Sequence, residues 1–239
     1  MQNFHGQLSK KIYLDYHMFT IILAEASLEL IPKELQNHPS VVSYSKKFQK
    51  NPSNTLLDNS WHFASMKGLK NEIKRGRPDI VHLTLLSLCT TPAFYEKKIK
   101  VFVHTVNNEI ITIHNQTRLP KSYHRFQGLI EKLFLTQKID TDDEILMELR
   151  SSSLSDLISE IKPTKIIGLT TKGKQTTLEK LIQQIPDNSC IIIGGFQKGH
   201  FNQDTEKIIN ESFSINDSPL EAHLVASRFV YEYEKTIFI

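Results

Sequence analysis

The sequence predicts an α/β fold, in which a mostly parallel β-sheet carries helices on its faces. The main evidence is the last third of the chain, where apolar strand-like runs alternate with helical ones. The composition agrees, because 39% hydrophobic and 23% charged residues are ordinary for a globular protein. The length of 239 residues suits one large domain, with or without an insertion. We therefore expect residues 1–239 to form a single domain.

The first two thirds of the chain contain strands and helices in less regular order. An apolar run over 80–88 suits a buried strand or a buried helix, and we interpret it as a strand. The pair Asn107-Asn108 suits the turn of a hairpin. In chain order we expect a strand that passes into a helix (19–31), helices (39–50 and 60–74), strands (80–88 and 99–105), a returning strand after the hairpin turn, and an amphipathic helix (122–135).

The last third predicts three strands and two helices, with a distinct start for the final helix. Ser218 suits the N-cap, Pro219 suits the first turn, and Glu221 can complete a capping box. In chain order we expect a strand (164–170), a helix (176–185), a strand (190–196), a short strand (213–215) and a helix (218–235).

Several classes of protein are disfavoured by what the sequence lacks. No apolar stretch approaches the roughly 20 residues that span a bilayer. Residues 1–17 lack the apolar core of a signal peptide, so we expect a cytoplasmic protein without a membrane partner. Cys89 and Cys190 are far apart and form no CxxC pair, which favours buried free thiols and no metal site.

Positive charge is concentrated in residues 41–77. Eight Lys or Arg residues stand there against Asp58 and Glu72, a net charge of +6, while the whole chain carries only +3. A basic stretch on a nearly neutral protein indicates a surface for a polyanion. The alternative is a solvated helix face.

A second basic cluster, within residues 115–135, precedes the amphipathic helix. Arg118 and Lys121 would lie at its N-terminus, with Arg125 one turn further on the same face. Cations are unfavourable at this end of a helix, because the helix dipole is positive there. The cluster is explained if an anion binds, and the alternative is screening of the charges by solvent.

The stretch Arg77-Pro78-Asp79 stands at the start of the apolar run 80–88. Pro78 fixes one backbone dihedral between two opposite charges. If Asp79 pairs with Arg77, the guanidinium is held in one orientation, suited to a phosphate or a base edge. A purely structural ion pair is the alternative.

Two glycine-containing segments follow predicted strands. The segment Gly168–Lys174 resembles a phosphate-binding loop, but Gln175 stands where Ser or Thr would bind magnesium, so an NTPase is disfavoured. The segment Gly194–Gly199 also follows a strand, and in a parallel sheet ligands lie beyond the carboxyl ends of strands. This segment, the one after Ile167 and the run 213–220 could together hold one small ligand.

Four motifs, in order, resemble those of one known family. The chain contains RGRPDIVHLTLL, TRLPKSYHRFQGL, GGFQKGHF and FSINDSPL, and LLDNSWHFASMK precedes them. Across almost the whole length, the chain resembles the SPOUT-class methyltransferases that modify N(1) of pseudouridine in small-subunit ribosomal RNA, the Nep/Emg ribosome-biogenesis family. The length looks archaeal.

The resemblance implies a Rossmann-like fold with a C-terminal deep trefoil knot, an additional N-terminal or inserted extension, and a homodimer. It also implies S-adenosylmethionine as cofactor, held by loops within 168–220. The cofactor positions implied are Leu169, Thr170, Gly194, Gly195, Gly199, Ser214, Ile215, Asn216, Pro219 and Leu220. The RNA positions implied are Arg77, Arg118, Lys121 and Arg125, with Asp79 orienting Arg77. Lys121 departs from the family's usual Arg, and Gln197-Lys198 departs from its usual Pro-His.

The expected chemistry is methyl transfer from an already activated donor, which mainly requires alignment. Arg77 and Asp79 are the catalytic candidates. Asp79 could act as a base, although pairing with Arg77 would lower its pKa. Stabilisation of the deprotonated nucleobase by Arg77, or proton loss to water, is as consistent with the motifs. A non-catalytic rRNA-binding assembly factor is the alternative function, and other ribosome assembly factors are possible partners.

Overall fold

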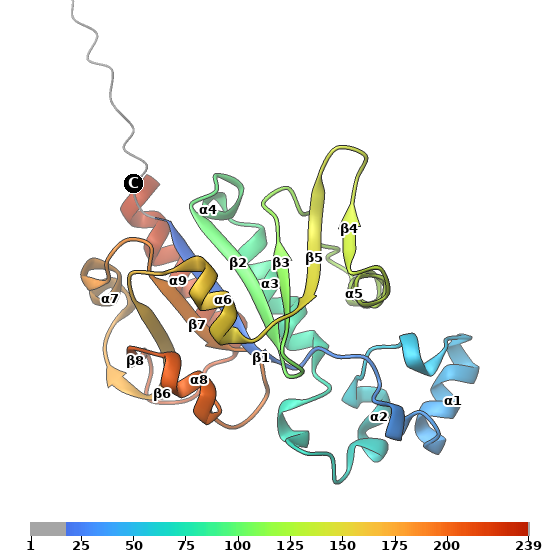
Figure 1. Cartoon of the computed structure of the whole chain (residues 1–239). Helices are drawn as coiled ribbons and strands as arrows, with labels where there is room; N and C mark the ends of the chain where they lie inside the picture. Colours follow the sequence, from blue (N-terminus) through green and yellow to red (C-terminus); the bar gives the residue numbers. More distant parts are fainter. Residues whose placement is uncertain (1–17, 239) are drawn as a thin grey trace, which may run out of the picture.

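The structure, a computed structural model, describes residues 18–238 (Figure 1). Its strands form one sheet in the order β4-β5-β3-β2-β1-β7-β6-β8. Neighbours from β2 to β8 are parallel, whereas β3, β5 and β4 form an antiparallel edge. The mostly parallel sheet is thus confirmed. The strands are β1 Phe19–Ala26, β2 Ile99–Thr105, β3 Glu109–Ile113, β4 Lys138–Asp140, β5 Ile145–Ser151, β6 Ile166–Gln175, β7 Cys190–Gly194 and β8 Glu211–Ser214.

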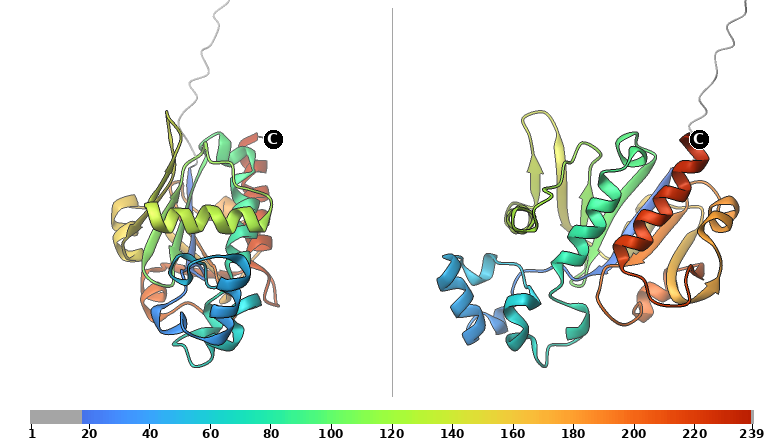
Figure 2. Two further views of the ribbon diagram at one scale, coloured as in Figure 1. Left: turned by 90° about the vertical axis from the view of Figure 1, so that its right-hand side faces the viewer. Right: turned by 180° about the vertical axis from the view of Figure 1, so that it is seen from behind.

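Helices cover both faces of the sheet (Figure 2). Alternate side chains of the buried strand β1 point to opposite layers: Ile21 and Leu23 belong to one apolar cluster, Ile22 and Ala24 to another. The first cluster includes side chains of α3 Pro78–Cys89, α5 Tyr123–Thr136, α7 Leu178–Gln184 and α9 Ala222–Phe238. The second includes side chains of α6 Leu154–Ile161 and α8 Gln203–Ile208, and a one-turn helix, α4 Pro92–Tyr95, precedes β2.

A small helical lobe, residues 27–77, follows β1 and projects beyond the carboxyl end of the sheet (Figure 1). It has a core of its own, formed by Ile31, Leu35, Val41, Leu57 and Met66. Its helices are α1 Pro39–Phe48 and α2 Asn59–Met66, with the 3₁₀ turns η1 Lys33–Leu35, η2 Pro52–Asn54 and η3 Glu72–Lys74.

The run 80–88 is a helix, and the predicted strand is wrong. Pro78 occupies the first turn, which its fixed φ favours. The hydroxyls of Thr84 and Ser87 donate to carbonyls one turn earlier, so these polar groups are satisfied within the helix. The sheet, α5 and α9 all contact α3, which leaves it with a nearly continuous apolar sequence and a weak helical period.

Two further expectations in the first third differ from the structure. Residues 27–31 form an extended segment instead of a helix, because Glu25 adopts a left-handed φ of 51° and the chain then pairs with Thr55–Leu57. The predicted helix 60–74 ends at Met66, followed by Gly68 at a φ of 86°.

The final helix begins at Ala222, so the predicted capping box at Ser218 is wrong. The carbonyl of Glu221 accepts hydrogen bonds from the amides of Leu224 and Val225, so Glu221 is the N-cap residue of α9. Residues 215–220 are irregular backbone. Because these residues are not part of the helix, they can border a cavity.

The sequence interpretation also missed β4, β5, α6 and α8. The acidic stretch around Asp142 attracted attention for its charge, but it is a turn that leads into β5. The start of α6 carries the only capping box among the described helices, between Ser153 and Asp156. Within residues 18–238, no helix has both the length and the apolar character needed to cross a membrane.

Candidate functional site

A cavity of about 430 Å³ lies at the carboxyl ends of β6, β7 and β8. Three separate segments form its walls: the end of the regular part of β6, the loop after β7, and the segment between β8 and α9. The sequence predicted that these three segments meet, and this is confirmed. The predicted residues that line the cavity are Leu169, Thr170, Gly194, Gly199, Ser214, Ile215, Asn216, Pro219 and Leu220.

Gly195 does not line the cavity, although it was expected among the cofactor-binding residues. A Cβ on Gly195 would lie 2.8 Å from the Cα of Ala26. Its amide donates to the carbonyl of Ala24, and its own carbonyl accepts from the amide of Ser27, both at 2.8 Å. Gly195 therefore allows β7 to leave the sheet tightly against the end of β1.

Gly194 and Gly199 meet different requirements of the loop. A Cβ on Gly194 would lie 2.9 Å from the ring of Phe196, so a side chain would displace that ring. Gly199 has a φ of 102°, which disfavours any other residue. Residues of the cavity wall that the sequence interpretation missed are Thr171, Ile193, Phe196, Gln197, Lys198, His200, Phe201, Ser218, Glu221, Ala222 and Val225, all of them in or near the three segments it had singled out.

Lys74 joins the helical lobe to the loop after β7. Its ammonium pairs with Glu25 (Nζ–Oε2 2.5 Å), donates to the carbonyl of His200, and lies 4.3 Å from the ring centroid of Phe196. The other carboxylate oxygen of Glu25 accepts from the amide of Asn202 at 2.8 Å. One buried ion pair thus connects the lobe, the end of β1 and the cavity loop.

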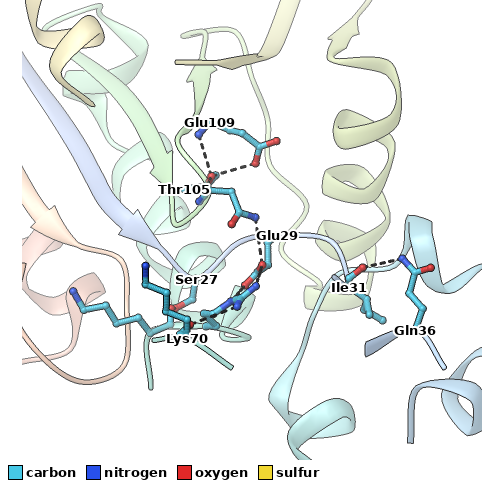
Figure 3. A network of polar contacts seen from close by, with 10 residues as sticks. Ser27, Glu29, Ile31, Gln36, Lys70, Thr105 and Glu109 are labelled. Atoms are coloured by element: carbon cyan, nitrogen blue, oxygen red, sulfur yellow. Dashed lines mark hydrogen bonds and ion pairs between the residues drawn. The ribbon is translucent and has the colours of Figure 1, made fainter. Parts of the chain in front are cut away.

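The root of the lobe is fixed by Glu29, whose side chain is buried (Figure 3). Both of its oxygens accept from the guanidinium of Arg75, each at 2.6 Å, and Asn107 donates to Oε2 at 3.3 Å. The hydroxyl of Ser27 donates to the carbonyl of Lys74 at 2.5 Å. The hydrogen bonds from Arg75 to Glu29 raise the pKa of Arg75. Together with the bond from Ser27, they hold Lys74 and Arg75 in place beside the sheet.

Gly168–Lys174 is not a phosphate-binding loop. It lies within β6, which continues to Gln175 and pairs with β8 through Lys174 and Phe213. A Cβ on Gly173 would overlap the backbone of Phe213, so this glycine permits close approach of two strands. A phosphate loop would need free amides ahead of a helix, and the NTPase interpretation is thereby excluded.

The predicted pairing of Arg77 with Asp79 is confirmed. Nε and Nη2 of Arg77 donate to the two carboxylate oxygens of Asp79 at 2.8 and 2.7 Å. The hydrogen bonds to Asp79 raise the pKa of Arg77, and the charges of Glu221 and Asp58 add to this effect. Glu221 also lines the cavity, so the cavity wall contains one of the charges that act on Arg77.

Arg118, Lys121 and Arg125 are exposed, and within residues 18–238 none of the three has an ion-pair partner. Their segment is anchored to α3, because Nε2 of His82 lies 2.7 Å from the carbonyl of Pro120. Since this carbonyl can only accept, His82 donates. The structure thus brings this basic segment beside the helix that begins at Arg77.

Asp58 fixes the first turn of α5 against the lobe. It accepts hydrogen bonds from the hydroxyl of Tyr123 at 2.5 Å and from the amide of Gln127 at 3.3 Å. Burial is the largest cause that raises the pKa of Tyr123 well above its usual range, and the hydrogen bond to Asp58 is the second. The phenol therefore stays protonated.

Among the described residues no group of His, Cys, Asp and Glu side chains could hold a metal ion. Burial raises the pKa of both free thiols, Cys89 and Cys190.

Comparison with known proteins gives a consistent result over nearly the whole chain. Residues 21–234 match the model of the EMG1/NEP1 methyltransferase family. Proteins named ribosomal RNA small subunit methyltransferase Nep1 are similar. That of Staphylothermus marinus is 39% identical over 213 residues, covering 88% of this chain and 93% of that protein. That of Thermococcus sibiricus is 39% identical over 224 residues, covering 92% and 99%. The crystal structure of Archaeoglobus fulgidus Nep1 bound to S-adenosylhomocysteine has a TM-score of 0.81 and 35% identity, covering 92% of this chain and 98% of that one.

Proposed function

The chain belongs to the EMG1/NEP1 methyltransferase family, and we propose that it methylates N(1) of a pseudouridine in small-subunit ribosomal RNA with S-adenosylmethionine. One observation carries the proposal beyond the family name. Glu221 belongs to the wall of the cavity at the strand ends, and its charge also acts on the guanidinium of Arg77 that Asp79 orients. A methyl donor and an RNA base could therefore meet between the cavity and Arg77.

The cavity suits S-adenosylmethionine in size and in lining. Its volume of about 430 Å³ is typical of a small-molecule site. Leu169, Ile193 and Leu220 supply apolar walls, and Gly194 leaves space for the ring of Phe196, which also lines the cavity. Ser214, Asn216 and Ser218 add polar residues to the lining. When bound, the cofactor supplies a methyl group already activated by its sulfonium. The trefoil knot around these segments stays a prediction.

The RNA side of the site is assigned to four cations. Asp79 already holds the side chain of Arg77 in one orientation, so RNA binding does not have to order that side chain. Arg118, Lys121 and Arg125 are exposed beside it and suit phosphate groups of the RNA. Lys121 carries a compact ammonium group and cannot make the two parallel hydrogen bonds of an arginine. We therefore assign it a simple charge contact with a phosphate.

In the mechanism we propose, Arg77 stabilises negative charge on the target base while its N(1) proton leaves. Asp79 is a poor base, because both carboxylate oxygens already accept from Arg77. Tyr123 is a poor base, because its phenol stays protonated. We therefore assign the proton to water, with Arg77 supplying the electrostatic stabilisation. The protein's other task is to hold the base, extruded from its stack, in line with the methyl group.

We also propose a homodimer in the cytoplasm, where small subunits of an organism without a nucleus are assembled. Solvent-exposed apolar side chains on α3 and α9, which pack together, support an association surface there. Contacts with other ribosome assembly factors are possible on the remaining faces.

A paired substrate experiment tests the proposed function. The protein is incubated with methyl-labelled S-adenosylmethionine and an rRNA hairpin that carries pseudouridine in its loop. The same hairpin with uridine is the control, because uridine has no N(1)–H. Label should enter only the pseudouridine hairpin. Equal labelling of both would refute the N(1) assignment, and no labelling of either would favour a non-catalytic assembly factor.

A further inference from the structure

Three aromatic rings form a cluster on the helical lobe, outside the cavity. Phe48 at the end of α1 and Trp61 at the start of α2 have their ring centroids 5.3 Å apart, edge to face. Tyr44 lies against both, at 4.6 and 5.4 Å. Tyr44 is buried, whereas Phe48 and Trp61 are 38% and 45% exposed. Large apolar rings that stay this exposed indicate a contact surface.

The cluster is surrounded by positive charge. Nζ of Lys47 lies 5.2 Å from the ring centroid of Phe48 and 4.9 Å from that of Trp61. Helices α1 and α2 contain no Asp or Glu, and the last turn of α1 carries Lys46 and Lys47. Asp58, just before α2, is buried and fully engaged. The carboxylates that act on Tyr44, those of Asp58 and Glu131, are both buried, and Glu131 is paired with Lys50. An exposed aromatic pair with an ammonium group beside it is complementary to a polyanion with flat apolar units.

The cluster rests on a fixed support. His62, fully buried, packs its ring 4.9 Å from that of Tyr44, edge to face. Nδ1 of His62 accepts from the amide of Asp58 at 3.0 Å, so Nε2 carries the ring proton. Rings held in this way need little further ordering when they bind a ligand, which favours affinity.

The cluster also continues the basic surface of the site. Asp58, which caps α2 one turn before Trp61, accepts from Tyr123 and Gln127 in α5. The first turns of α5 carry Arg125, and Lys121 precedes them. Lys50, after α1, pairs with Glu131 further along α5 at 2.6 Å. In the left view of Figure 2, α5 and the lobe face the same side of the molecule.

We propose that Phe48 and Trp61 form a stacking platform for unpaired bases of the RNA that flank the target nucleotide, with Lys47 contacting the backbone between them. The inference rests on the proposed function, because it extends the same RNA surface. Stacking on aromatic faces is the usual way in which proteins hold splayed bases. The platform would recognise single-stranded character, whereas Arg77 would act at the target itself.

Trp61 offers a direct optical test, because it is the only tryptophan in the chain. The protein is titrated with the pseudouridine hairpin and, separately, with a fully paired RNA duplex of equal length. The hairpin should quench the tryptophan emission, since a base stacks on the indole, and the duplex should quench it far less. Binding of the hairpin without a change in emission would overturn the proposal.

Substitutions separate the ring from the helix that carries it. Trp61→Ala should weaken hairpin binding at least about fivefold, the lower end for loss of one base stack, while Trp61→Phe should retain most of the affinity. Phe63→Ala is the matched control, because Phe63 is an exposed aromatic residue on the same helix but outside the cluster. Circular dichroism confirms that each variant is folded.

The outcomes distinguish this proposal from the proposed function. Unchanged affinity in folded Trp61→Ala, or an equal loss in Phe63→Ala, would overturn the platform, even if the parent protein methylates the hairpin. A parent protein that binds the hairpin through Trp61 but transfers no methyl group would overturn the proposed reaction and leave the platform standing. If Trp61→Ala instead disrupts capture of a purified assembly factor while hairpin affinity is unchanged, the surface belongs to a protein partner.

Discussion

Asp79 uses both of its carboxylate oxygens to hold one guanidinium, that of Arg77. Neither residue is fully buried, since their side chains are 23% and 40% exposed. An ion pair with this exposure contributes little to stability. We therefore propose that the pair serves to orient Arg77 toward a ligand.

This role predicts different effects of two substitutions on RNA affinity. Arg77→Ala should cost about 1–3 kcal/mol of binding free energy if its contact is bidentate. Asp79→Ala should cost less, because the guanidinium remains but is no longer held. Both are measured by fluorescence anisotropy with the labelled hairpin. Calorimetry with S-adenosylhomocysteine should show unchanged cofactor affinity.

Arg150→Ala is the matched control, because Arg150 makes a similar bidentate pair with Glu160 at β5 and α6. It should leave RNA affinity unchanged. A different result for Asp79→Ala, with intact RNA affinity and no methyl transfer, would identify Asp79 as the base and contradict its orienting role.

His104 predicts how stability depends on pH. It is buried, and burial lowers its pKa below the ordinary 6.5. As pH falls below 6.5, the unfolded chain gains a proton that the folded protein does not, so the free energy of unfolding decreases. His104 contributes at most about 1.4 kcal/mol per pH unit to the change in the free energy of unfolding. Burial lowers the pKa of His62 in the same way.

Urea unfolding between pH 7.5 and pH 5.0 measures this dependence. The decrease should be clear in the parent protein and smaller in His104→Gln, where only His62 still contributes. An equal decrease in both proteins would mean that His104 takes up its proton as readily in the folded state.

At the scale of elements, the cavity depends on contacts between segments that are distant in sequence. Lys74 belongs to the lobe, yet it bonds to Glu25 at the end of β1 and to the carbonyl of His200 in the loop after β7. The proposed RNA surface and the proposed cofactor loop are therefore parts of one connected structure.

Lys74→Met should weaken the affinity for S-adenosylhomocysteine by roughly 1.5 kcal/mol, the scale of one hydrogen bond to a charged group. It should also destabilise the fold, because Glu25 is left buried without its partner. Glu25→Gln in addition should restore much of the stability without restoring affinity. Calorimetry and urea unfolding separate the two effects. If the double variant regains full affinity, the loop does not depend on Lys74.

Two glycines in different elements predict opposite effects of the same substitution. Gly173→Ala would force β6 away from Phe213, and such overpacking costs about 1–3 kcal/mol. Gly128 lies in α5 with no atom within 4 Å of an added Cβ, so Gly128→Ala should stabilise by about 0.5–1 kcal/mol. Denaturant unfolding of both variants measures the difference. Equal effects would contradict the close approach of the two strands.

At the scale of the whole molecule, the two faces of the sheet differ in what they expose. Helices α3 and α9 pack against each other and carry exposed apolar side chains, among them Leu83, Leu224 and Tyr231. If the proposed homodimer forms through these helices, this surface is covered in solution, while α5 and the lobe stay available to RNA.

Light scattering coupled to size exclusion tests this arrangement. The parent protein should have the mass of a dimer, and Leu224→Lys with Tyr231→Lys should shift it toward the monomer, since buried unpaired charges are costly. Leu135→Lys, at an exposed position of α5, is the control and should leave the dimer intact. A parent protein that is a monomer at micromolar concentration would contradict the proposal.

The sequence by itself determined the parallel sheet and the segments of the cavity. Strand–helix alternation and glycines after strands are local signals, and strand ends of a parallel sheet meet at one edge whatever the details. The pairing of Arg77 with Asp79 was also predictable from a local signal. The two residues are two positions apart, and Pro78 between them limits the backbone conformations.

Only the tertiary structure decided the other features. Residues 80–88 pack against the sheet, α5 and α9, but their less buried side also carries apolar residues, Leu83 and Leu86, so the sequence lacks the polar stripe that marks a helix. Helix α9 starts at Ala222 and not at Ser218, because residues 218–221 border the cavity. Lys74 reaches Glu25, and Gly195 reaches Ala26, across long sequence separations. Such contacts depend on how whole elements pack, and no local pattern encodes that packing.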